Sequence, residues 1–289
     1  MVKVLVIGGS GFLGSHIADE LSNRGFEVTI FDNRDSTWAS KKQKVIVGDI
    51  SDEKSLEKVI SNSDVVYHMA GIADIGESDQ NPLDTINSNI VASSLIMSLC
   101  AKHSVRFMFG STVYVFSKHG SFYRASKQSV ETLIDVFHEQ KGLDFTIIRF
   151  GSLYGPRSQP WNGVKKIVSE MIQNKSITFY GTGKEKREYI HVKDAARMSV
   201  DLLSEDYLQK AVTLTGLQVL TQRELLEMIA EIMNEDVSIN FDRNSTKDSH
   251  YSLTPYQYVP KSSVKLVSSE YIDIGQGLLE LISDISNET

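Results

Sequence analysis

The sequence predicts an α/β fold, with a doubly wound parallel sheet and a smaller carboxy-terminal lobe. Short β-branched runs alternate with helical stretches in the first half of the chain, which implies right-handed crossovers and a sheet covered on both faces. The turn-rich segment "YGPRSQPWNG", at 154–163, breaks this pattern. We therefore predict a first domain over 1–155 and a smaller lobe over 156–289, with a strand and helix at 188–205 returning to the first domain.

The elements can be assigned in order. "VKVLVIGG" is a buried β-branched strand that ends at glycine. The helix after it carries Leu13, Ile17 and Leu21 on one stripe and ends at Gly25. The further strands are "EVTIFD", "KVIVGDI", "DVVYHMAG", "VRFMFGST" and "FTIIRFGS". In the second half, helices are predicted at 163–175 and at 221–233, the latter opening with the capping box of Thr221 and Glu224.

Composition excludes several classes of function. The net charge is −7 with no basic stripe, which argues against a nucleic-acid partner. The amino terminus lacks a signal-peptide pattern, and no apolar run approaches the ~20 residues that span a membrane, so we expect a cytoplasmic protein. Cys100 is the single cysteine; it permits no intrachain disulfide, and we expect it to pack as a small hydrophobe rather than act as a nucleophile. No motif indicates a metal site.

A glycine-rich turn predicts a dinucleotide site of the Rossmann type. "GGSGFLG" places Gly8, Gly11 and Gly14 between the first strand and the first helix, where backbone N–H groups can approach a pyrophosphate. The alternative is a plain strand-to-helix turn. Asp32 ends the second strand, 18 residues after Gly14, and can accept hydrogen bonds from both ribose hydroxyls. Its charge favours NAD over NADP, although Arg34 lies near it in the sequence.

Four Tyr-x-x-x-Lys matches compete as a catalytic pair. They are Tyr114 with Lys118, Tyr123 with Lys127, Tyr180 with Lys184, and Tyr189 with Lys193. Tyrosine and lysine at this spacing share a face only on a helix. Tyr180 precedes glycines, while Tyr189 and Tyr114 lie in strand-like segments. Tyr123 alone opens a convincing helix, and it closely follows a strand end.

The chemistry of this pair favours proton abstraction coupled to hydride transfer. A free phenol has a pKa of ~10, so it is a poor base at neutral pH. The ammonium of Lys127 and a positive nicotinamide should favour the phenolate, which can take a proton from a substrate hydroxyl. Ser111 and Thr112, at the end of the preceding strand, each offer a hydroxyl to hold that substrate group.

These motifs together resemble the NAD-dependent nucleotide-sugar epimerase/dehydratase family, the extended short-chain dehydrogenases/reductases. Nearly the whole chain takes part, in the family's order, through "GGSGFLG", "FDN", "GDI", "HMAGIADIGES", "RFMFGST", "YRASK", "RFGSLYGPR" and "REYIHVKD". The segment "HMAGIADIGESDQNPLDTINSN" is most similar to UDP-glucose 4-epimerases. The resemblance implies a Rossmann-type domain with NAD as the cofactor, and a smaller lobe that binds a nucleotide-diphosphate sugar.

The resemblance also implies the roles of individual residues. The catalytic residues are Thr112, Tyr123 and Lys127. The cofactor-binding residues are Gly8, Gly11, Phe12, Leu13, Gly14, Asp32, Asn33, Asp49, Ile50, Ala70, Gly71, Asn89, Tyr123, Lys127 and Phe150. The substrate-binding residues are Thr112, Ser152 and Arg187. For Arg187, which would face the substrate's diphosphate, the alternative is a surface residue in the charged run "KEKRE".

Departures from the family's pattern limit the reaction. Val113 and Tyr114 stand where dehydratases carry an Asp-Glu pair and decarboxylases carry a glutamate, which disfavours both reactions. Ser152 replaces an asparagine that normally touches the sugar nucleotide, and Ala73 replaces a lysine found in many galactose-type epimerases. The segment between Thr112 and Tyr123, which helps to roof the sugar, is shorter than usual.

The leading hypothesis is an enzyme that oxidises C4 of a nucleotide-diphosphate sugar with NAD and works as a 4-epimerase. The alternatives are a net 4-dehydrogenase that releases the ketosugar and, less favoured because the Tyr/Lys pair is kept, a non-catalytic NAD sensor. Helices at 84–103 and 121–141 are expected to form the four-helix bundle of a homodimer, unless the first of them is buried within the monomer. The segment 251–266 is expected to touch substrate.

Overall fold

The centre of the molecule is an eight-stranded sheet in which every pair of neighbouring strands is parallel. The computed structural model describes residues 1–117, 119–234, 236–242, 264–268 and 270–288. The strands of this sheet, in their spatial order, are β13 (Val264–Lys265), β10 (Lys210–Leu214), β6 (Phe145–Phe150), β5 (Arg106–Thr112), β4 (Val65–His68), β1 (Lys3–Ile7), β2 (Glu27–Asp32) and β3 (Gln43–Val47). The predicted doubly wound parallel sheet is therefore confirmed.

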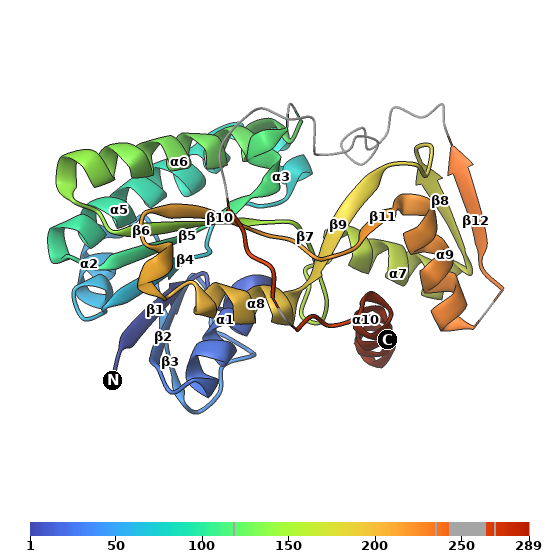
Figure 1. The fold of residues 1–289 in the computed structure, drawn as a ribbon, viewed down its shortest axis with the longest axis horizontal. Coiled ribbons are helices and arrows are strands. Elements are labelled where there is room, and N and C mark those ends of the chain that lie inside the picture. The colour runs from blue at the N-terminus through green and yellow to red at the C-terminus, as the bar shows by residue number, and fades with distance from the viewer. Residues whose placement is uncertain (118, 235, 243–263, 269, 289) are drawn as a thin grey trace.

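Helices cover both faces of the sheet, as Figure 1 shows. The helices α1 (Phe12–Asn23) and α8 (Val192–Asp201) lie on one face, and α2 (Glu53–Ile60), α5 (Ala92–His103) and α6 (Ser121–Lys141) lie on the other. Successive residues of β1 point to opposite faces: Val4 packs in the core under α1 and α8, and Leu5 packs in the core under the other helices. Cys100 is fully buried in this second core, as expected. Within the described ranges, no helix has both the length and the apolar character that crossing a membrane requires.

The loops after β4 and β5 carry short helices toward the carboxyl edge of the sheet. After β4 come α3 (Ile75–Gln80), α4 (Pro82–Ile86) and the π-helix η1 (Asn87–Val91), and after β5 comes the 3-10 helix η2 (Val113–Phe116). The strand-like assignment of Tyr114 is therefore wrong. Thr112 accepts a hydrogen bond from the backbone N–H of Tyr114 at 3.2 Å and so turns the chain out of the sheet. A short apolar run does not distinguish a buried turn from a strand.

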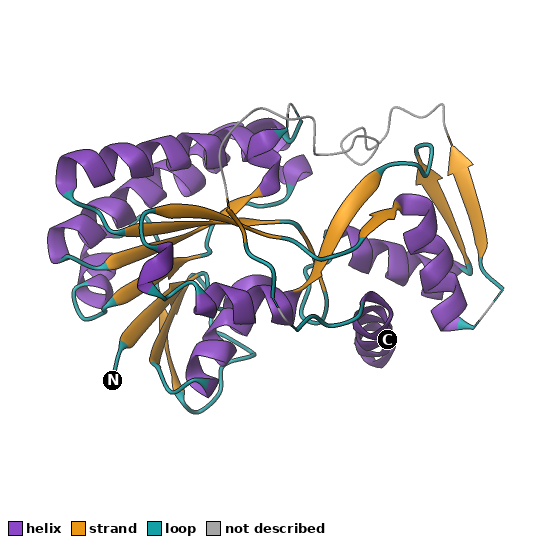
Figure 2. Cartoon of the chain, in the orientation of Figure 1, coloured by secondary structure: helices purple, strands orange, loops and turns teal. Residues whose placement is uncertain are grey.

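The smaller lobe is built on two small sheets and its own core (Figure 2). Its strands are β7 (Ser152–Tyr154), β9 (Lys186–His191) and β11 (Val219–Thr221) in one sheet, and β8 (Ser176–Tyr180) and β12 (Ser238–Asp242) in the other. Its helices are α7 (Gly163–Asn174), α9 (Gln222–Met233) and α10 (Ile274–Glu288). The capping box that opens α9 is formed by Thr221 and Glu224, as predicted. The chain passes between the lobes through β7 and β9 (Figure 1).

The predicted return at 188–205 is only partly right, because the strand β9 pairs with β7 and β11 in the smaller lobe and the return to the main sheet begins with α8. The helix α8 packs against α1, and a 3-10 turn, η3 (Glu205–Tyr207), leads into β10, which pairs with β6. Because β10 and β13 both lie in the main sheet, the range 156–289 does not form one continuous lobe. The strand β10, with the sequence KAVTL, was not predicted.

Candidate active site

A cavity of about 1190 Å³ opens between the lobes, at the carboxyl edge of the main sheet. Most of the predicted site residues line it, namely Gly8, Gly11, Phe12, Leu13, Gly14, Asp32, Asn33, Asp49, Ile50, Ala70, Gly71, Thr112, Tyr123, Lys127, Phe150, Ser152 and Arg187. Open α/β sheets bind ligands at this edge, where the strand order reverses beside β1. The structure thus brings together residues that lie far apart in the sequence.

One end of the cavity, which we call the glycine end, is made of backbone at Gly8, Gly11 and Gly14. A Cβ atom at Gly14 would lie 2.2 Å from the carbonyl oxygen of Gly8, and one at Gly8 would lie 2.5 Å from the backbone nitrogen of Ala70. Gly8 also has a φ of +86°, which glycine adopts without strain. Gly11 caps α1 without any side-chain hydrogen bond, which leaves its first N–H groups free for a phosphate. This cradle suits the pyrophosphate of a dinucleotide.

Two carboxylates lie at the glycine end. Asp32, at the end of β2, accepts a hydrogen bond from the backbone N–H of Ser10 at 2.9 Å, which joins it to the glycine-rich turn. Asp49 accepts hydrogen bonds at 2.8 Å from the backbone N–H and the hydroxyl of Ser51, and these lower the pKa of Asp49. Arg34 lines the cavity too, and its backbone N–H donates to Asp32 at 3.3 Å. The carboxylate of Asp32 is therefore held in place by backbone at the cavity wall.

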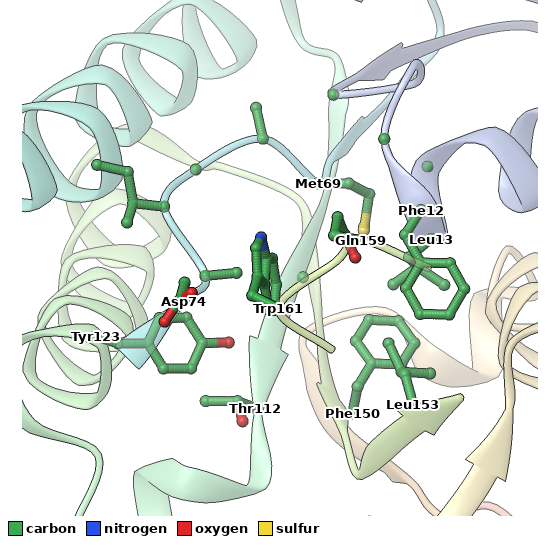
Figure 3. Close-up of a pocket in the computed structure, with 18 of the residues that line it drawn as sticks. Phe12, Leu13, Met69, Asp74, Thr112, Tyr123, Phe150, Leu153, Gln159 and Trp161 are labelled. Atoms are coloured by element: carbon green, nitrogen blue, oxygen red, sulfur yellow. The ribbon is translucent and has the colours of Figure 1, made fainter. Parts of the chain in front are cut away.

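The other end, which we call the tyrosine end, contains Tyr123 and Thr112. Tyr123 stands in the first turn of α6, and Figure 3 shows its hydroxyl directed into the cavity, with Thr112 nearby. Burial of the phenol raises the pKa of Tyr123 to about 12, while a hydrogen bond with the Thr112 side chain acts in the opposite direction. A group with this pKa stays protonated near neutral pH until a further positive charge approaches it.

Lys127 lies one turn further along α6 and is buried. Its Nζ donates a hydrogen bond to the carbonyl oxygen of Gly110 at 2.7 Å and lies 4.7 Å from the centre of the Phe109 ring. Burial lowers the pKa of Lys127 to about 8, which Glu131 partly offsets. Burial therefore shifts both side chains toward their neutral forms, and the effect of Lys127 on the phenolate stays a prediction.

A buried ion pair anchors α6 behind this pair. Arg149 on β6 donates to both carboxylate oxygens of Glu131, at 3.0 and 2.8 Å, and both side chains are almost completely buried. The hydroxyl of Ser111 also donates to Glu131, at 2.6 Å. This bond distinguishes the two candidate hydroxyls at the end of β5: Ser111 is engaged with the scaffold, whereas Thr112 interacts with Tyr123 at the cavity.

The structure places Asn89 behind the cavity wall, so its contact with the cofactor stays a prediction. Asn89 lies in the π-helix η1, is 2% exposed and does not reach the cavity wall. Its amide accepts from the backbone N–H of Ile72 at 2.7 Å and donates to the carbonyl of Ile72 at 2.8 Å and to the hydroxyl of Ser126 at 3.0 Å. It therefore ties the cavity loop after β4 to the helix that carries Tyr123, a role that a sequence motif does not reveal.

Arg187 is a buried cavity residue rather than a surface residue. It lies on β9, is 2% exposed, and its guanidinium donates to the hydroxyl of Tyr114 at 3.5 Å. Sequence reasoning missed Tyr114, Asp74 and Trp161 as cavity residues. Tyr114 was assigned to a strand. Trp161 lies in the turn-rich break, where a large aromatic residue could have indicated a cavity position. The segment expected to touch substrate, 251–266, lies mostly outside the described residues.

Comparison with known proteins identifies the family. The sequence profile of the NAD dependent epimerase/dehydratase family matches residues 4–212, most of the 289-residue chain. The chain belongs to this family. It is therefore an enzyme of an NAD-dependent family, which confirms the resemblance and the choice of NAD made from Asp32.

Individual relatives carry more than one activity. UDP-glucuronic acid decarboxylase 1 of Arabidopsis thaliana is 26% identical, over 99% of this chain and 70% of that protein. The structure of UDP-glucose 4-epimerase with UDP-glucose from Thermotoga maritima is similar with a TM-score of 0.84 at 25% identity, covering 99% of both chains. The UDP-N-acetylglucosamine 4-epimerase from Methanobrevibacter ruminantium, in complex with UDP-N-acetylmuramic acid, has a TM-score of 0.85 at 25% identity, covering 100% of this chain and 99% of that one.

Proposed function

We propose that this protein oxidises C4 of a nucleotide-diphosphate sugar and returns the hydride to the opposite face, as a sugar-nucleotide 4-epimerase. The observation that carries the proposal is that the hydroxyl side chains of Tyr123 and Thr112 lie in one cavity with the glycine-rich turn (Figure 3). Oxidation of an alcohol needs a base for the hydroxyl proton beside a hydride acceptor, and this cavity has room for both. The two 4-epimerase structures of similar fold support the choice of carbon and of reaction.

The chain's own residues then have distinct tasks. Thr112 holds the sugar hydroxyl in line with the Tyr123 oxygen, which takes its proton and returns it to the product. The glycine end would hold NAD, which would supply the hydride acceptor and the positive charge that a phenol of pKa about 12 needs in order to ionise. Lys127, in the next turn of α6, adds positive charge that favours the phenolate form of Tyr123. Arg187 faces the diphosphate of the sugar nucleotide.

Two other reactions of this family are disfavoured by the residues that follow Thr112. Val113 is an apolar side chain buried in the protein, and the hydroxyl of Tyr114 bonds to Arg187. Neither side chain is a carboxyl that could move the second proton needed to eliminate water, or take the place of the decarboxylases' glutamate. We therefore keep the 4-epimerase as the proposal, although the Arabidopsis relative is a decarboxylase by name.

A net 4-dehydrogenase is the second candidate. Between Thr112 and the start of α6, the described residues form just the short turn η2, which is a small cover for the tyrosine end. A weakly covered site would release the ketosugar more readily than a closed one.

Turnover assays separate these candidates. The protein would be incubated with NAD and with UDP-glucose or UDP-N-acetylglucosamine, while NADH absorbance and the sugar products are followed. A new epimer without net NADH supports the epimerase, whereas accumulating NADH and ketosugar indicate the dehydrogenase. If neither sugar reacts and NAD still binds, the proposal is overturned in favour of a non-catalytic NAD sensor.

We also propose that the protein forms a homodimer. Exposed apolar side chains occur on the outer surface of α4, η1 and α6; they are Leu83, Ile86, Val91, Phe122 and Val136. Most apolar side chains of α5, in contrast, are already buried within the monomer, which is the alternative raised for that helix. A second copy that presents the same helices by two-fold symmetry would cover this surface.

Sedimentation equilibrium tests the dimer. The wild type is expected to sediment as a dimer at micromolar concentration, and the double variant Leu83→Lys, Val91→Lys as a monomer that still binds NAD. A monomeric wild type would contradict the proposal.

A further inference from the structure

We propose that Asp74 makes the tyrosine end select sugars that present hydroxyl or amide donors and discriminate against sugars that carry an acidic group. This inference rests on the proposed function, since it concerns the sugar that the same cavity accepts. The chain's curated relatives include a UDP-glucuronic acid decarboxylase, so an acidic sugar is a real competitor.

Asp74 is fixed at the cavity wall by local structure. It caps α3, and its Oδ1 accepts hydrogen bonds from the backbone N–H groups of Gly76 at 2.7 Å and Glu77 at 3.3 Å. The helix α3 packs against α6, which carries Tyr123, and Figure 3 shows Asp74 and Tyr123 on the same side of the cavity. Both of these bonds use Oδ1, so Oδ2 can accept a hydrogen bond from a ligand.

The charged side chains around the tyrosine end bear on whether the site accepts a sugar that carries a carboxylate. Outside the glycine end, Asp74 at the start of α3 and Asp84 on α4 give the described cavity residues two carboxylates, while Lys127 and Arg187 carry positive charges. Lys127 donates to the Gly110 carbonyl beneath the tyrosine. Arg187 interacts with Tyr114 and is the candidate for the diphosphate. A sugar carboxylate placed next to Asp74 would meet its negative charge, whereas a hydroxyl or amide N–H there can donate to Asp74.

The alternative, that Asp74 serves only as a helix cap, predicts no effect on sugar choice. The substitution Asp74→Asn separates the two roles, because asparagine caps helices about as well as aspartate and has nearly the same shape. Asp79→Asn is the matched control: it removes one carboxylate from the same helix, at an exposed position that does not line the cavity.

Calorimetric titration with NAD present gives the test, with UDP, UDP-glucose and UDP-glucuronate as ligands. The wild type is expected to bind UDP-glucuronate at least roughly tenfold more weakly than UDP-glucose, which corresponds to about 1.4 kcal/mol of repulsion. Asp74→Asn should remove most of that difference and leave the UDP affinity unchanged, while Asp79→Asn should keep it. In the wild type, added salt should narrow the difference, because screening weakens repulsion between charges.

Other outcomes overturn the inference. Equal wild-type affinity for the two sugars, or an unchanged ratio in Asp74→Asn, would remove the selective role. If Asp74→Asn binds UDP-glucose normally but no longer turns it over, Asp74 is an acid or base in the reaction instead. If the wild type does not bind UDP at all, it is the proposed function that fails, and this inference falls with it.

Discussion

The two ends of the cavity are built in different ways. The glycine end consists mainly of backbone from one continuous stretch, the turn between β1 and α1, where added Cβ atoms would collide with other backbone atoms. The tyrosine end consists of side chains from separate elements: Tyr123 on α6, Thr112 on β5, Asp74 before α3 and Arg187 on β9. Backbone recognises a part common to every NAD molecule, whereas side chains can change the sugar and the reaction without disturbing the fold.

The largest expected effect is at the tyrosine end. Replacing Tyr123 with Phe removes the hydroxyl and leaves the ring, so the rate of sugar turnover should fall roughly 10²- to 10⁴-fold, as expected when a general base is lost. NAD affinity, which depends on the glycine end, should change little. Steady-state kinetics and NAD titration measure the two quantities.

Tyr180→Phe is the control for that substitution. Tyr180 has a lysine at the same spacing but ends β8, outside the cavity residues, so its turnover should match the wild type. Equal losses in both variants would mean that the cavity does not select the active tyrosine.

At the glycine end, Gly14→Ala should weaken the binding of NAD, the property that Tyr123→Phe is expected to leave nearly unchanged. Its Cβ would lie 2.2 Å from the Gly8 oxygen, and relieving such an overlap costs about 1–3 kcal/mol. We expect NAD affinity to fall roughly tenfold or more, measured by titration. UDP affinity should be nearly unchanged.

The matched glycine control is Gly25→Asn. Gly25 has a φ of +84° and no atom within 4 Å of an added Cβ, and asparagine tolerates that conformation. Loss of NAD binding in this variant as well would show that any glycine substitution harms the fold, and the contrast between the ends would fail.

A smaller effect is expected from Arg187→Met. The long apolar side chain keeps the volume but cannot donate hydrogen bonds, so the KM for a UDP-sugar should rise roughly tenfold. The rate at saturation and the NAD affinity should change less. If NAD binding were the property lost, Arg187 would belong to the cofactor rather than to the sugar nucleotide.

The stability of the main domain should fall at low pH, and this effect does not depend on either end of the cavity. Burial lowers the pKa of His68 to about 3, below the ~6.5 of an unfolded chain. Its neutral form therefore contributes stability above about pH 6.5 that is lost as the pH falls toward 3. The melting temperature should fall between pH 7 and pH 4, and less steeply in His68→Gln.

His16, whose pKa burial lowers to about 4, keeps its own contribution in that variant. An unchanged slope in His68→Gln would mean that His68 does not take part in acid destabilisation.

The sequence predicts the glycine end better than the tyrosine end for a physical reason. The turn of Gly8, Gly11 and Gly14 and the acid Asp32 follow from local order along the chain, because the steric demand of a backbone cradle is local. The alternation of strands and helices likewise predicted the sheet and its covered faces. The boundary near residue 155 was only partly right, because β10 and β13 return to the main sheet through long-range pairing.

The tyrosine end depends on contacts between distant segments. Choosing Tyr123 among four matches needed only its helix, but Asp74 and Trp161 reach the cavity through loop geometry that composition does not encode. Asn89 shows the same dependence, because its amide bonds to the backbone of the loop at Ile72, a contact that its motif did not predict. The raised pKa of Tyr123 likewise follows from desolvation, which the bare spacing of tyrosine and lysine does not report.

The most direct test of the central claim is turnover of UDP-glucose labelled with deuterium at C4. If hydride leaves C4 while Tyr123 takes the hydroxyl proton, turnover should be slower than with unlabelled sugar, and the epimer formed should retain the deuterium at C4. Epimer that has exchanged its deuterium for solvent hydrogen, or turnover in Tyr123→Phe at the wild-type rate, would contradict the account.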